Sequence, residues 1–469
     1  MERCEERTFV LGVNYWPRTK AMQWWSRFEE EEVERDFKDL REMGINLVRI
    51  FLLWSNFQPS GPSTVDETCL SHLETVLNIA QRHGLWLDIT FFTGHMSGPN
   101  WAPRWMILED EPLRSDCNGV RRLVVGTEAE VKRCGHRNIY TDPMCLEAEE
   151  VLLRAVVSRF GDHPAVGMWN LGNEPDLFGR PPSAESGASW VRSMRQIIVS
   201  CYEEKESLRM PSHEGRQITR PPITCGLHAD SLIMDNGLRV DKVFSELDVR
   251  VMHGYPMYAS GWSRHPLDPD FVPFLCDLTA ALSSTTSSSS SFQYPSFLDH
   301  RLTGPLAQRS SQTLMEEFGG CTLPPTPLSD PKLESVDGSY WKWNCCGDER
   351  RQFMASEDEM ADYLELVLRK LHSSGALGAV LWCFADYHND LWDQPPCDES
   401  LHERFFGLVR PDGSWKPHAF VLQRFSQSLS SLPSPSLSAA RISVDPDEYY
   451  LNPRQNAIEI YQRYLSDRE

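Results

Sequence analysis

Two glutamates stand in sequence contexts that suit acid–base and nucleophilic chemistry. Glu174 lies in the stretch WNLGNEP at 169–175, and Glu317 lies in LMEEFGG at 314–320. Each carboxylate comes at the end of an apolar, strand-like run, and only a large fold can bring two such distant stretches together. Two carboxylates that face one substrate can cleave a glycosidic bond, because one protonates the leaving oxygen while the other attacks the sugar carbon. A lone glutamate at a strand end is usually an ordinary surface residue, so the pair must be judged with its surroundings.

The elements that must position this pair alternate between strand-like and helix-like segments from residue 9 to residue 386. Two amphipathic segments end at Gly44 and Gly84, as helices commonly do. Strands that alternate with helices indicate a parallel sheet with right-handed crossovers, and eight strands are the number that closes a (β/α)8 barrel. The predicted strands are 9–16, 45–53, 85–92, 165–173, 223–228, 248–253, 313–317 and 378–385, and the predicted helices are 33–43, 70–82, 145–160, 189–206 and 357–373.

The predicted fold class is therefore α/β, a (β/α)8 TIM barrel with long loop insertions and a C-terminal appendage. Residues 1–424 would form the barrel, 425–439 a Ser/Pro-rich linker and 440–469 a C-terminal tail. Within the barrel, the serine-rich stretch 283–291 is too polar to bury much surface, and it is predicted to be a disordered insertion.

Composition narrows the class of partner. The chain has 469 residues and a formal net charge of −21, without a run of Lys or Arg, so nucleic acid is not an expected partner. An acidic surface disfavours polyanionic substrates but is compatible with neutral oligosaccharides or polysaccharides. The N-terminus lacks the apolar core of a signal peptide, and no uncharged apolar run is long enough to span a membrane. As written, the chain is expected to be soluble and cytoplasmic, or secreted if the true N-terminus is missing.

Other chemistries find little support in the sequence. The 13 cysteines have no regular spacing, and Cys134 with His136 lacks the accompanying CxxC pairs of a zinc site. No metal and no cofactor are therefore expected. A serine hydrolase is disfavoured because no G-x-S-x-G elbow occurs, and a nucleotide enzyme because neither G-x-G-x-x-G nor a P-loop occurs.

Further polar and aromatic residues lie at the ends of the predicted strands, in chain order. Together with the two glutamates they resemble the pattern of glycoside hydrolase family 5, the cellulase and mannanase family of the retaining barrel clan. The match spans 9–386 and includes GLVRPDG at 407–413. Asn-Glu-Pro alone would be a weak signal, but the whole set in register is specific. The residues that complete the pattern are Arg49, His95, Asn173, His253, Tyr255 and Trp382.

The resemblance implies a role for each of the two glutamates. Glu174 would be the general acid/base, and its site should raise its pKa so that it is protonated near neutral pH. Glu317 would be the nucleophile, kept ionised and oriented by Arg49 and Tyr255. Glu316 is an ambiguity, because adjacent strand residues point to opposite sides and only one of the doublet can face the substrate. The family pattern places the nucleophile directly before aromatic-Gly, which selects Glu317.

The same resemblance implies roles for the remaining residues around the substrate. Asn173 would bind the sugar 2-hydroxyl, His253 would position the acid/base, and His95 would contact a substrate hydroxyl. Trp382 would offer a flat apolar face to the sugar. Trp16, one of many tryptophans on the predicted loops, would add another aromatic surface for substrate, although about half of these tryptophans are expected to pack the loops instead.

The substrate is less determined than the reaction. The stretch GVNYWP at 12–17, with Trp24 and Trp25 and then RIF at 49–51, is more similar to mannan- and mannoside-active members than to typical cellulases. Hydrolysis of β-mannosides or β-1,4-mannan is predicted, with β-1,4-glucan as the alternative substrate. A carbohydrate-binding barrel that has lost catalysis is the alternative from another class. Long loops after strands six and seven would favour a pocket and exo action, but exo or endo action and the oligomeric state stay open.

Overall fold

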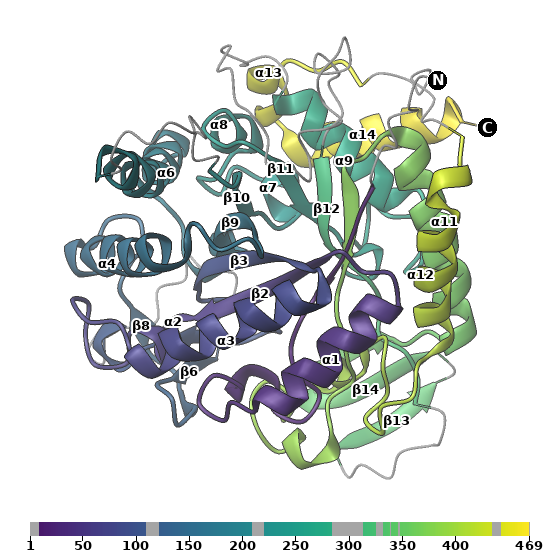
Figure 1. The fold of residues 1–469 in the computed structure, drawn as a ribbon. Coiled ribbons are helices and arrows are strands. Elements are labelled where there is room, and N and C mark those ends of the chain that lie inside the picture. The colour runs from purple at the N-terminus through teal and green to yellow at the C-terminus, as the bar shows by residue number, and fades with distance from the viewer. Residues whose placement is uncertain are drawn as a thin grey trace, which may run out of the picture.

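The computed structural model describes residues 9–108, 122–208, 220–283, 313–324, 332–337, 339–345, 348–433 and 442–468. Eight parallel strands form its central sheet, in the order β10-β9-β3-β2-β1-β16-β12-β11. Two backbone hydrogen bonds close the sheet between β10 and β11, from Asp248 N to Ile223 O and from His253 N to Leu227 O, each 3.0 Å long. The fold is thus the predicted (β/α)8 barrel (Figure 1). Its strands are β1 (Val10–Asn14), β2 (Leu47–Leu53), β3 (Trp86–Thr93), β9 (Val166–Asn173), β10 (Ile223–Gly226), β11 (Arg250–His253), β12 (Thr313–Phe318) and β16 (Gly378–Leu381).

The barrel strands are buried almost throughout. All seven residues of β2 and all eight of β9 are buried, because the barrel interior covers one side of each strand and the outer helices cover the other. The strands consequently lack the alternation of apolar and polar residues that a half-exposed sheet shows.

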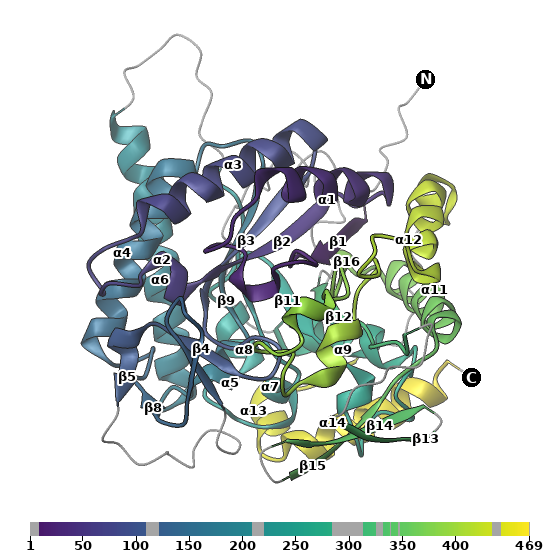
Figure 2. The same cartoon turned by 90° about the horizontal axis from the view of Figure 1, so that it is seen from below.

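A ring of helices surrounds the sheet and follows the strands in turn (Figures 1 and 2). The five predicted helices are confirmed, and Gly44 and Gly84 follow the first two with positive φ of 85° and 65°, a conformation that glycine adopts readily. Three helices of the ring were not predicted, namely α8, α9 and α12. The ring consists of α1 (Glu30–Glu42), α3 (Glu67–His83), α4 (Pro143–Phe160), α6 (Ala184–Leu208), α8 (Val240–Phe244), α9 (Phe271–Ser283), α11 (Glu357–Ser374) and α12 (Pro417–Ser428).

The missed helix α9 lacks an amphipathic pattern for a physical reason. It packs on β11 and β12 on one side and contacts α8, α11 and the C-terminal helix α14 on others, so nearly all of its residues are buried. A helix that is covered on all sides is apolar all round and carries little periodic signal. Ser283 is its last residue and is buried, so the predicted serine-rich insertion begins after it. The rest of that insertion lies outside the described residues.

Long excursions follow several strands at their C-terminal ends. After β3 come the short strands β4 (Asn100–Ala102), β5 (Ile107–Leu108), β6 (Leu123–Val125), β7 (Glu130–Lys132) and β8 (Gly135–His136). After β12 come the antiparallel strands β13 (Leu333–Asp337), β14 (Tyr340–Cys345) and β15 (Asp348–Phe353). After β16 come the 3-10 helices η5 (Asn389–Leu391) and η6 (Leu401–Phe405). Single helical turns complete the loops: η1 (Ala21–Gln23), α2 (Trp54–Phe57), η2 (Arg104–Met106), α5 (Pro175–Phe178), α7 (Asp230–Ile233), η3 (Pro256–Tyr258) and η7 (Leu429–Ser431).

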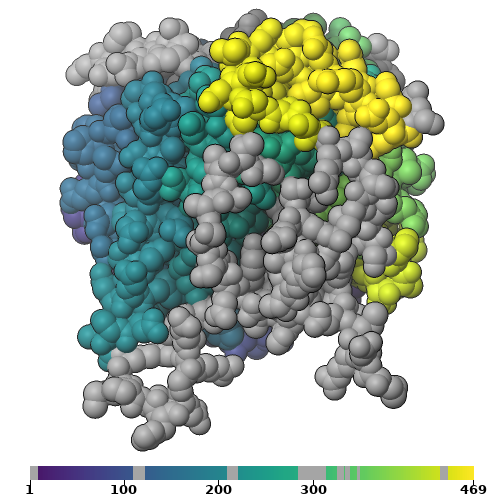
Figure 3. Space-filling view, turned by 90° about the horizontal axis from the view of Figure 1, so that it is seen from above, coloured from purple at the N-terminus to yellow at the C-terminus, as the bar shows by residue number. Residues whose placement is uncertain are grey.

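The C-terminal segment packs on the barrel as α13 (Pro446–Tyr450) and α14 (Pro453–Ser466). The hydroxyl of Tyr449 donates to Leu232 O (2.7 Å) and that of Tyr450 to Ser231 O (2.8 Å), which fixes the segment to α7. Figure 3 shows it in yellow as a surface layer on the barrel. The predicted linker begins too early, because 425–428 complete α12 and 429–431 form η7. Among the described residues, no helix is long and apolar enough to cross a membrane.

Candidate active site

A pocket of about 250 Å³ lies at the C-terminal ends of the barrel strands, where the excursions converge. Glu174, Glu317, Asn173, His95 and Trp382 all line it, together with Tyr255 from the end of β11. These residues come from five different strands or the loops directly after them, as the barrel geometry requires. Its other lining residues are Met96, Ser97, Gly98, Leu177, His228, Asp230, Tyr258, Ser400, His402, Glu403 and Phe406.

Glu174 takes its place through an uncommon backbone conformation. It follows β9 directly and has a φ of +46°, and its own N–H donates to Gly226 O (2.9 Å) of the neighbouring strand. A non-glycine residue at positive φ is strained, and such residues gather at functional sites. The carboxylate lies 3.0 Å from His253 Nδ1 and 3.9 Å from His95 Nε2. Its side chain is 9% exposed, and that surface opens into the pocket.

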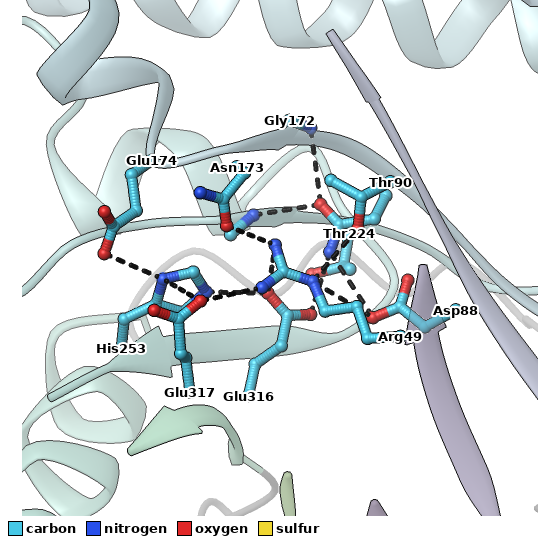
Figure 4. Close-up of polar contacts among 12 residues, drawn as sticks. Arg49, Asp88, Thr90, Gly172, Asn173, Glu174, Thr224, His253, Glu316 and Glu317 are labelled. Atoms are coloured by element: carbon cyan, nitrogen blue, oxygen red, sulfur yellow. Dashed lines mark hydrogen bonds and ion pairs between the residues drawn. The ribbon is translucent and has the colours of Figure 1, made fainter. Parts of the chain in front are cut away.

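Glu317 receives hydrogen bonds at both carboxylate oxygens, and Figure 4 shows it beside Arg49, one of the two donors. The Tyr255 hydroxyl donates to Oε1 over 2.7 Å, and Arg49 Nη1 donates to Oε2 over 3.1 Å. One carboxylate oxygen of Glu317 lies within 4.8 Å of one of Glu174. An approach this close fits the roughly 5–5.5 Å between the carboxyl groups of retaining glycosidases better than the roughly 6.5–9.5 Å of inverting enzymes.

Glu316 and Glu317 differ in their depth below the pocket and do not lie on opposite faces of β12. The register of β12 against β16 shifts between Met315 and Phe318, and both carboxylates consequently reach Arg49. Glu316 is fully buried beneath the pocket, where it accepts from Asn170 Nδ2 (2.9 Å) and faces His253 Nε2 (3.0 Å). The premise of strict alternation is thus wrong at this strand end, although Glu317 is the member of the doublet that lines the pocket.

Arg49 holds the floor of the site together from within β2, whereas the sequence analysis placed it at the end of a strand. Its guanidinium is fully buried and donates to Glu317, to Asn173 Oδ1 (3.0 Å) and to Thr90 Oγ1 (3.0 Å). Asn173 in turn donates from Nδ2 to His95 O (2.9 Å), which uses one of the two hydrogens on that nitrogen. Arg49 thus orients both the carboxylate and the neighbouring amide that face a ligand.

The electrostatics of the resting site differ from the expectation for Glu174. Burial raises its pKa, but His228, His253 and His95 outweigh burial, and the net direction is downward. Burial likewise raises the pKa of Glu317, and there the Glu174 carboxylate adds to the effect against His253 and Arg49, so the net direction is upward.

His228 has the largest effect among the groups that lower the pKa of Glu174, and His253 is the one that also shares a hydrogen bond with it. Burial alone would lower the pKa of His253, but Glu317, Glu174 and Glu316 surround the ring and raise the pKa to about 10. In the resting site His253 is therefore a protonated imidazolium, and its Nδ1 is hydrogen-bonded to Glu174. Because His253 contacts both pocket carboxylates, protonation of any one of these three groups affects the other two.

Trp16 has a different position from the one predicted. It has no exposed surface and is not among the residues that line the pocket. Its ring stacks on Phe51 with an angle of 4° between the planes, and Phe51 packs edge-on against Trp382. Trp16 therefore backs the tryptophan that faces the pocket and does not offer its own surface to a substrate.

Several pocket residues were missed by the sequence analysis, among them His228 after β10, Tyr258 in η3, and His402 and Glu403 in η6. They lie in irregular loops, where no periodic pattern or strand end marks them. A weak signal was available only for His228, which follows the short strand β10 directly.

One group of residues could geometrically hold a metal ion. Among the described residues, Glu174, His253 and Glu317 are the one set of at least three potential ligands whose donor atoms lie within 4.8 Å of one another. Both pocket carboxylates would coordinate a cation there, and His253 would have to be neutral to do the same. The geometry is equally that of an acid/base and nucleophile pair with its proton-holding histidine.

Comparison with known proteins gives sequence matches over parts of the chain. A β-galactosidase family model, that of glycoside hydrolase family 42, matches residues 22–196. A probable mannan endo-1,4-β-mannosidase A-2 of Aspergillus terreus is 24% identical over 198 residues. That alignment covers 39% of this chain and 43% of the fungal protein, so the match spans less than half the length of this curated relative.

Solved structures match over almost the whole chain. A GH5_18 enzyme variant of Streptomyces cattleya, in complex with Manβ1-4GlcNAc, has a TM-score of 0.68 at 16% identity and covers 98% of this chain and 91% of that one. The exo-β-1,4-mannosidase Op5Man5 of Opitutaceae bacterium strain TAV5 has a TM-score of 0.60 at 22% identity, over 91% of this chain and 60% of that one. The barrel fold and the predicted resemblance to glycoside hydrolase family 5 are thereby confirmed.

Proposed function

We propose that this protein hydrolyses β-mannosides with retention of anomeric configuration, by double displacement at Glu317 and Glu174. The observation that carries this proposal is the approach of the two carboxylates to within 4.8 Å at the wall of one pocket. This distance suits direct attack by one carboxylate on the sugar carbon while the other serves the leaving oxygen.

Glu317 would act as the nucleophile in the first step. Arg49 and Tyr255 fix the orientation of its carboxylate, and their hydrogen bonds favour the ionised form that attack requires. The bond from Glu317 to the sugar carbon forms as the bond to the leaving oxygen breaks, and a covalent glycosyl-enzyme results. In the second step a water molecule, deprotonated by Glu174, attacks the same carbon and releases Glu317.

His253 would supply the proton that Glu174 passes to the leaving oxygen. Its Nδ1 lies 3.0 Å from Glu174 Oε1, and its raised pKa keeps a proton on the ring at neutral pH. Transfer along this hydrogen bond makes Glu174 a carboxylic acid at the moment when the leaving oxygen gains charge. Glu316, on the other ring nitrogen, holds the imidazole in place and stabilises its charge.

One observation favours a mannoside as the substrate, and a second favours a sugar at the end of a chain. The relatives and structural neighbours include a probable endo-β-mannosidase, an exo-β-1,4-mannosidase and an enzyme in complex with Manβ1-4GlcNAc. The site is also a small pocket walled by the loops after β3, β11 and β16, which suits one sugar at a chain end better than the middle of a polysaccharide. β-1,4-Glucan and, because of the family model that matches 22–196, β-galactosides are the alternatives.

A panel of aryl glycosides tests this proposal. The β-mannoside should be cleaved faster than the β-glucoside and β-galactoside, and NMR of the first product should show the β-anomer. Manβ1-4GlcNAc and short manno-oligosaccharides should release mannose, whereas mannan should be a poor substrate. Inversion of configuration would refute the mechanism, release of oligosaccharides from mannan would refute exo action, and binding without turnover would indicate a barrel that has lost catalysis.

Azide rescue separates the two members of the doublet. Glu317→Ala should have no turnover, and azide should restore cleavage of an activated aryl mannoside with inverted product, because the anion fills the space of the lost nucleophile. Glu316→Gln should also be impaired, since Glu316 orients Arg49 and His253, but azide should not restore it. Rescue of the Glu316 variant alone would show that the nucleophile is misassigned.

A further inference from the structure

The loop after β16 places a third carboxyl group in the pocket. Glu403 lies in η6 and lines the pocket together with Glu174 and Glu317. Its side chain is only 10% exposed. Glu403 takes no part in either catalytic step, and a buried carboxyl group without a charged partner is costly to keep.

Glu403 has no cationic partner within salt-bridge distance in the described part of the chain. The titratable side chain within that distance is His402, whose Nε2 lies 3.6 Å from Glu403 Oε1. Burial lowers the pKa of His402 to about 3, so this ring is neutral. Its Nε2 is moreover engaged by the Tyr258 hydroxyl at 2.8 Å.

The same wall contains polar atoms that lack hydrogen-bond partners. Glu403 Oε2, Ser97 Oγ and His402 Nδ1 are all buried without a bond of normal geometry, and all three residues line the pocket. An unsatisfied buried polar group costs about 1–3 kcal/mol, and native structures contain few of them. Ser97 and Trp382 do lie near enough to Glu403 to lower its pKa through hydrogen bonding. The three buried atoms nevertheless leave hydrogen-bonding capacity in one wall, which a bound molecule can use after a small adjustment of that wall.

The charge state of Glu403 indicates the chemistry of that partner. Burial raises its pKa to about 8, with Glu317 and Glu174 adding to the effect and Ser97 and Trp382 opposing it. A protonated carboxyl group offers one donor and one acceptor, which is the complement of a sugar hydroxyl. A neutral wall also avoids a further negative charge beside the two catalytic carboxylates.

We propose that Glu403 is a specificity-determining residue that binds a hydroxyl group of the sugar held beside Glu174 and Glu317. This inference rests on the proposed function, because it assumes that a sugar occupies the pocket. It assigns recognition of the sugar to η6, an element outside the barrel strands that supply the two catalytic glutamates.

Deoxy sugars combined with substitutions of Glu403 test this assignment. The probes are an aryl β-mannoside and its 3-, 4- and 6-deoxy analogues, with Glu403→Ala, Glu403→Gln and the matched surface control Asp390→Asn. Asp390 lies in the same loop with its side chain 85% exposed. The melting temperature of each variant shows whether it is folded.

For the wild type we expect one deoxy analogue to lose roughly 10- to 100-fold in kcat/KM, the size of a lost hydrogen bond to a buried polar group. Glu403→Ala should lose a similar factor on the parent mannoside, and the same deoxygenation should then cost less than about threefold, because the two groups are coupled. Glu403→Gln, which keeps a donor and an acceptor, should retain most activity, and Asp390→Asn should behave as the wild type.

The outcomes separate this inference from the proposed function. If the protein is active but deoxygenation costs the same in Glu403→Ala as in the wild type at every position, the inference is overturned and the function stands. If no glycoside is cleaved, calorimetric titration with D-mannose and its deoxy analogues decides instead. If removal of one hydroxyl weakens binding to the wild type but not to Glu403→Ala, Glu403 recognises that hydroxyl in a protein without catalysis. If removal of no hydroxyl shows this difference, or if mannose does not bind, the inference is overturned.

Discussion

Replacement of Tyr255 by Phe should move the acidic limb of the pH–activity profile. The Tyr255 hydroxyl donates a 2.7 Å hydrogen bond to Glu317, and this bond lowers the pKa of that carboxyl group. A hydrogen bond to a charged group contributes about 1.5–3 kcal/mol. At about 1.36 kcal/mol per pKa unit, its loss corresponds to roughly one to two units. Because Arg49 still holds the other oxygen, we expect a shift near one unit.

The sign follows from the form of Glu317 that attacks. Attack requires the ionised carboxylate, so a higher pKa moves the acidic limb of kcat/KM to higher pH. The assay measures kcat/KM over a series of pH values with an activated aryl β-mannoside. The leaving group of this substrate needs little protonation, so the acidic limb of the pH profile reports the ionisation of the nucleophile.

A matched substitution far from the pocket controls for the loss of a buried hydroxyl. Tyr363, on α11, is buried and its hydroxyl has no hydrogen-bond partner within the part of the chain described. Tyr363→Phe should leave the profile in place. An unchanged acidic limb in an active, folded Tyr255→Phe variant would refute the argument that this hydroxyl helps to keep the nucleophile ionised.

Three further predictions concern stability. Lys416→Met should lower the free energy of unfolding by about 3–5 kcal/mol in denaturant melts, because it strands the buried Asp386 carboxylate 2.7 Å away; adding Asp386→Asn should recover part of the loss. Tyr450→Phe should cost about 1–3 kcal/mol, since it leaves Ser231 O and Val240 N–H without their partner; an unchanged melt would show that these two hydrogen bonds do not stabilise the fold. Burial raises the pKa of Asp36 to about 7, so its protonated form stabilises the fold at low pH and that stabilisation is lost as pH rises through about 7; the melting temperature of Asp36→Asn relative to wild type should therefore increase from pH 5 to pH 8.

Sequence patterns sufficed for the barrel because the periodicity of its elements is local. Each barrel strand is a short apolar run and several helices end at a glycine, so neighbours in the chain carry the signal. The pattern failed at α9, which the C-terminal helix α14 covers on its outer side. It failed also for residues 425–431, where a serine-rich composition resembles a linker but continues α12 into η7.

The floor of the site was predictable for a related reason. In a parallel barrel the C-terminal ends of all strands meet at one end of the molecule, so residues at strand ends converge whatever their separation in the chain. Hydrogen bonds and ion pairs in this way join Asn173, Glu174, His253 and Glu317, which lie at or near the ends of β9, β11 and β12, to Arg49 within β2.

Only the tertiary structure decided the depth, charge and walls of the pocket. The register shift in β12 places Glu316 beneath the pocket and Glu317 at its surface, and packing on Phe51 removes Trp16 from it. Three carboxylates around His253 place the resting proton on its ring, which no single position in the chain can indicate. Glu403 comes from an irregular loop whose course is set by contacts across the fold. The sequence by itself thus determined which residues gather at the strand ends, because that depends on local patterns, while their protonation and the walls around them depend on long-range packing.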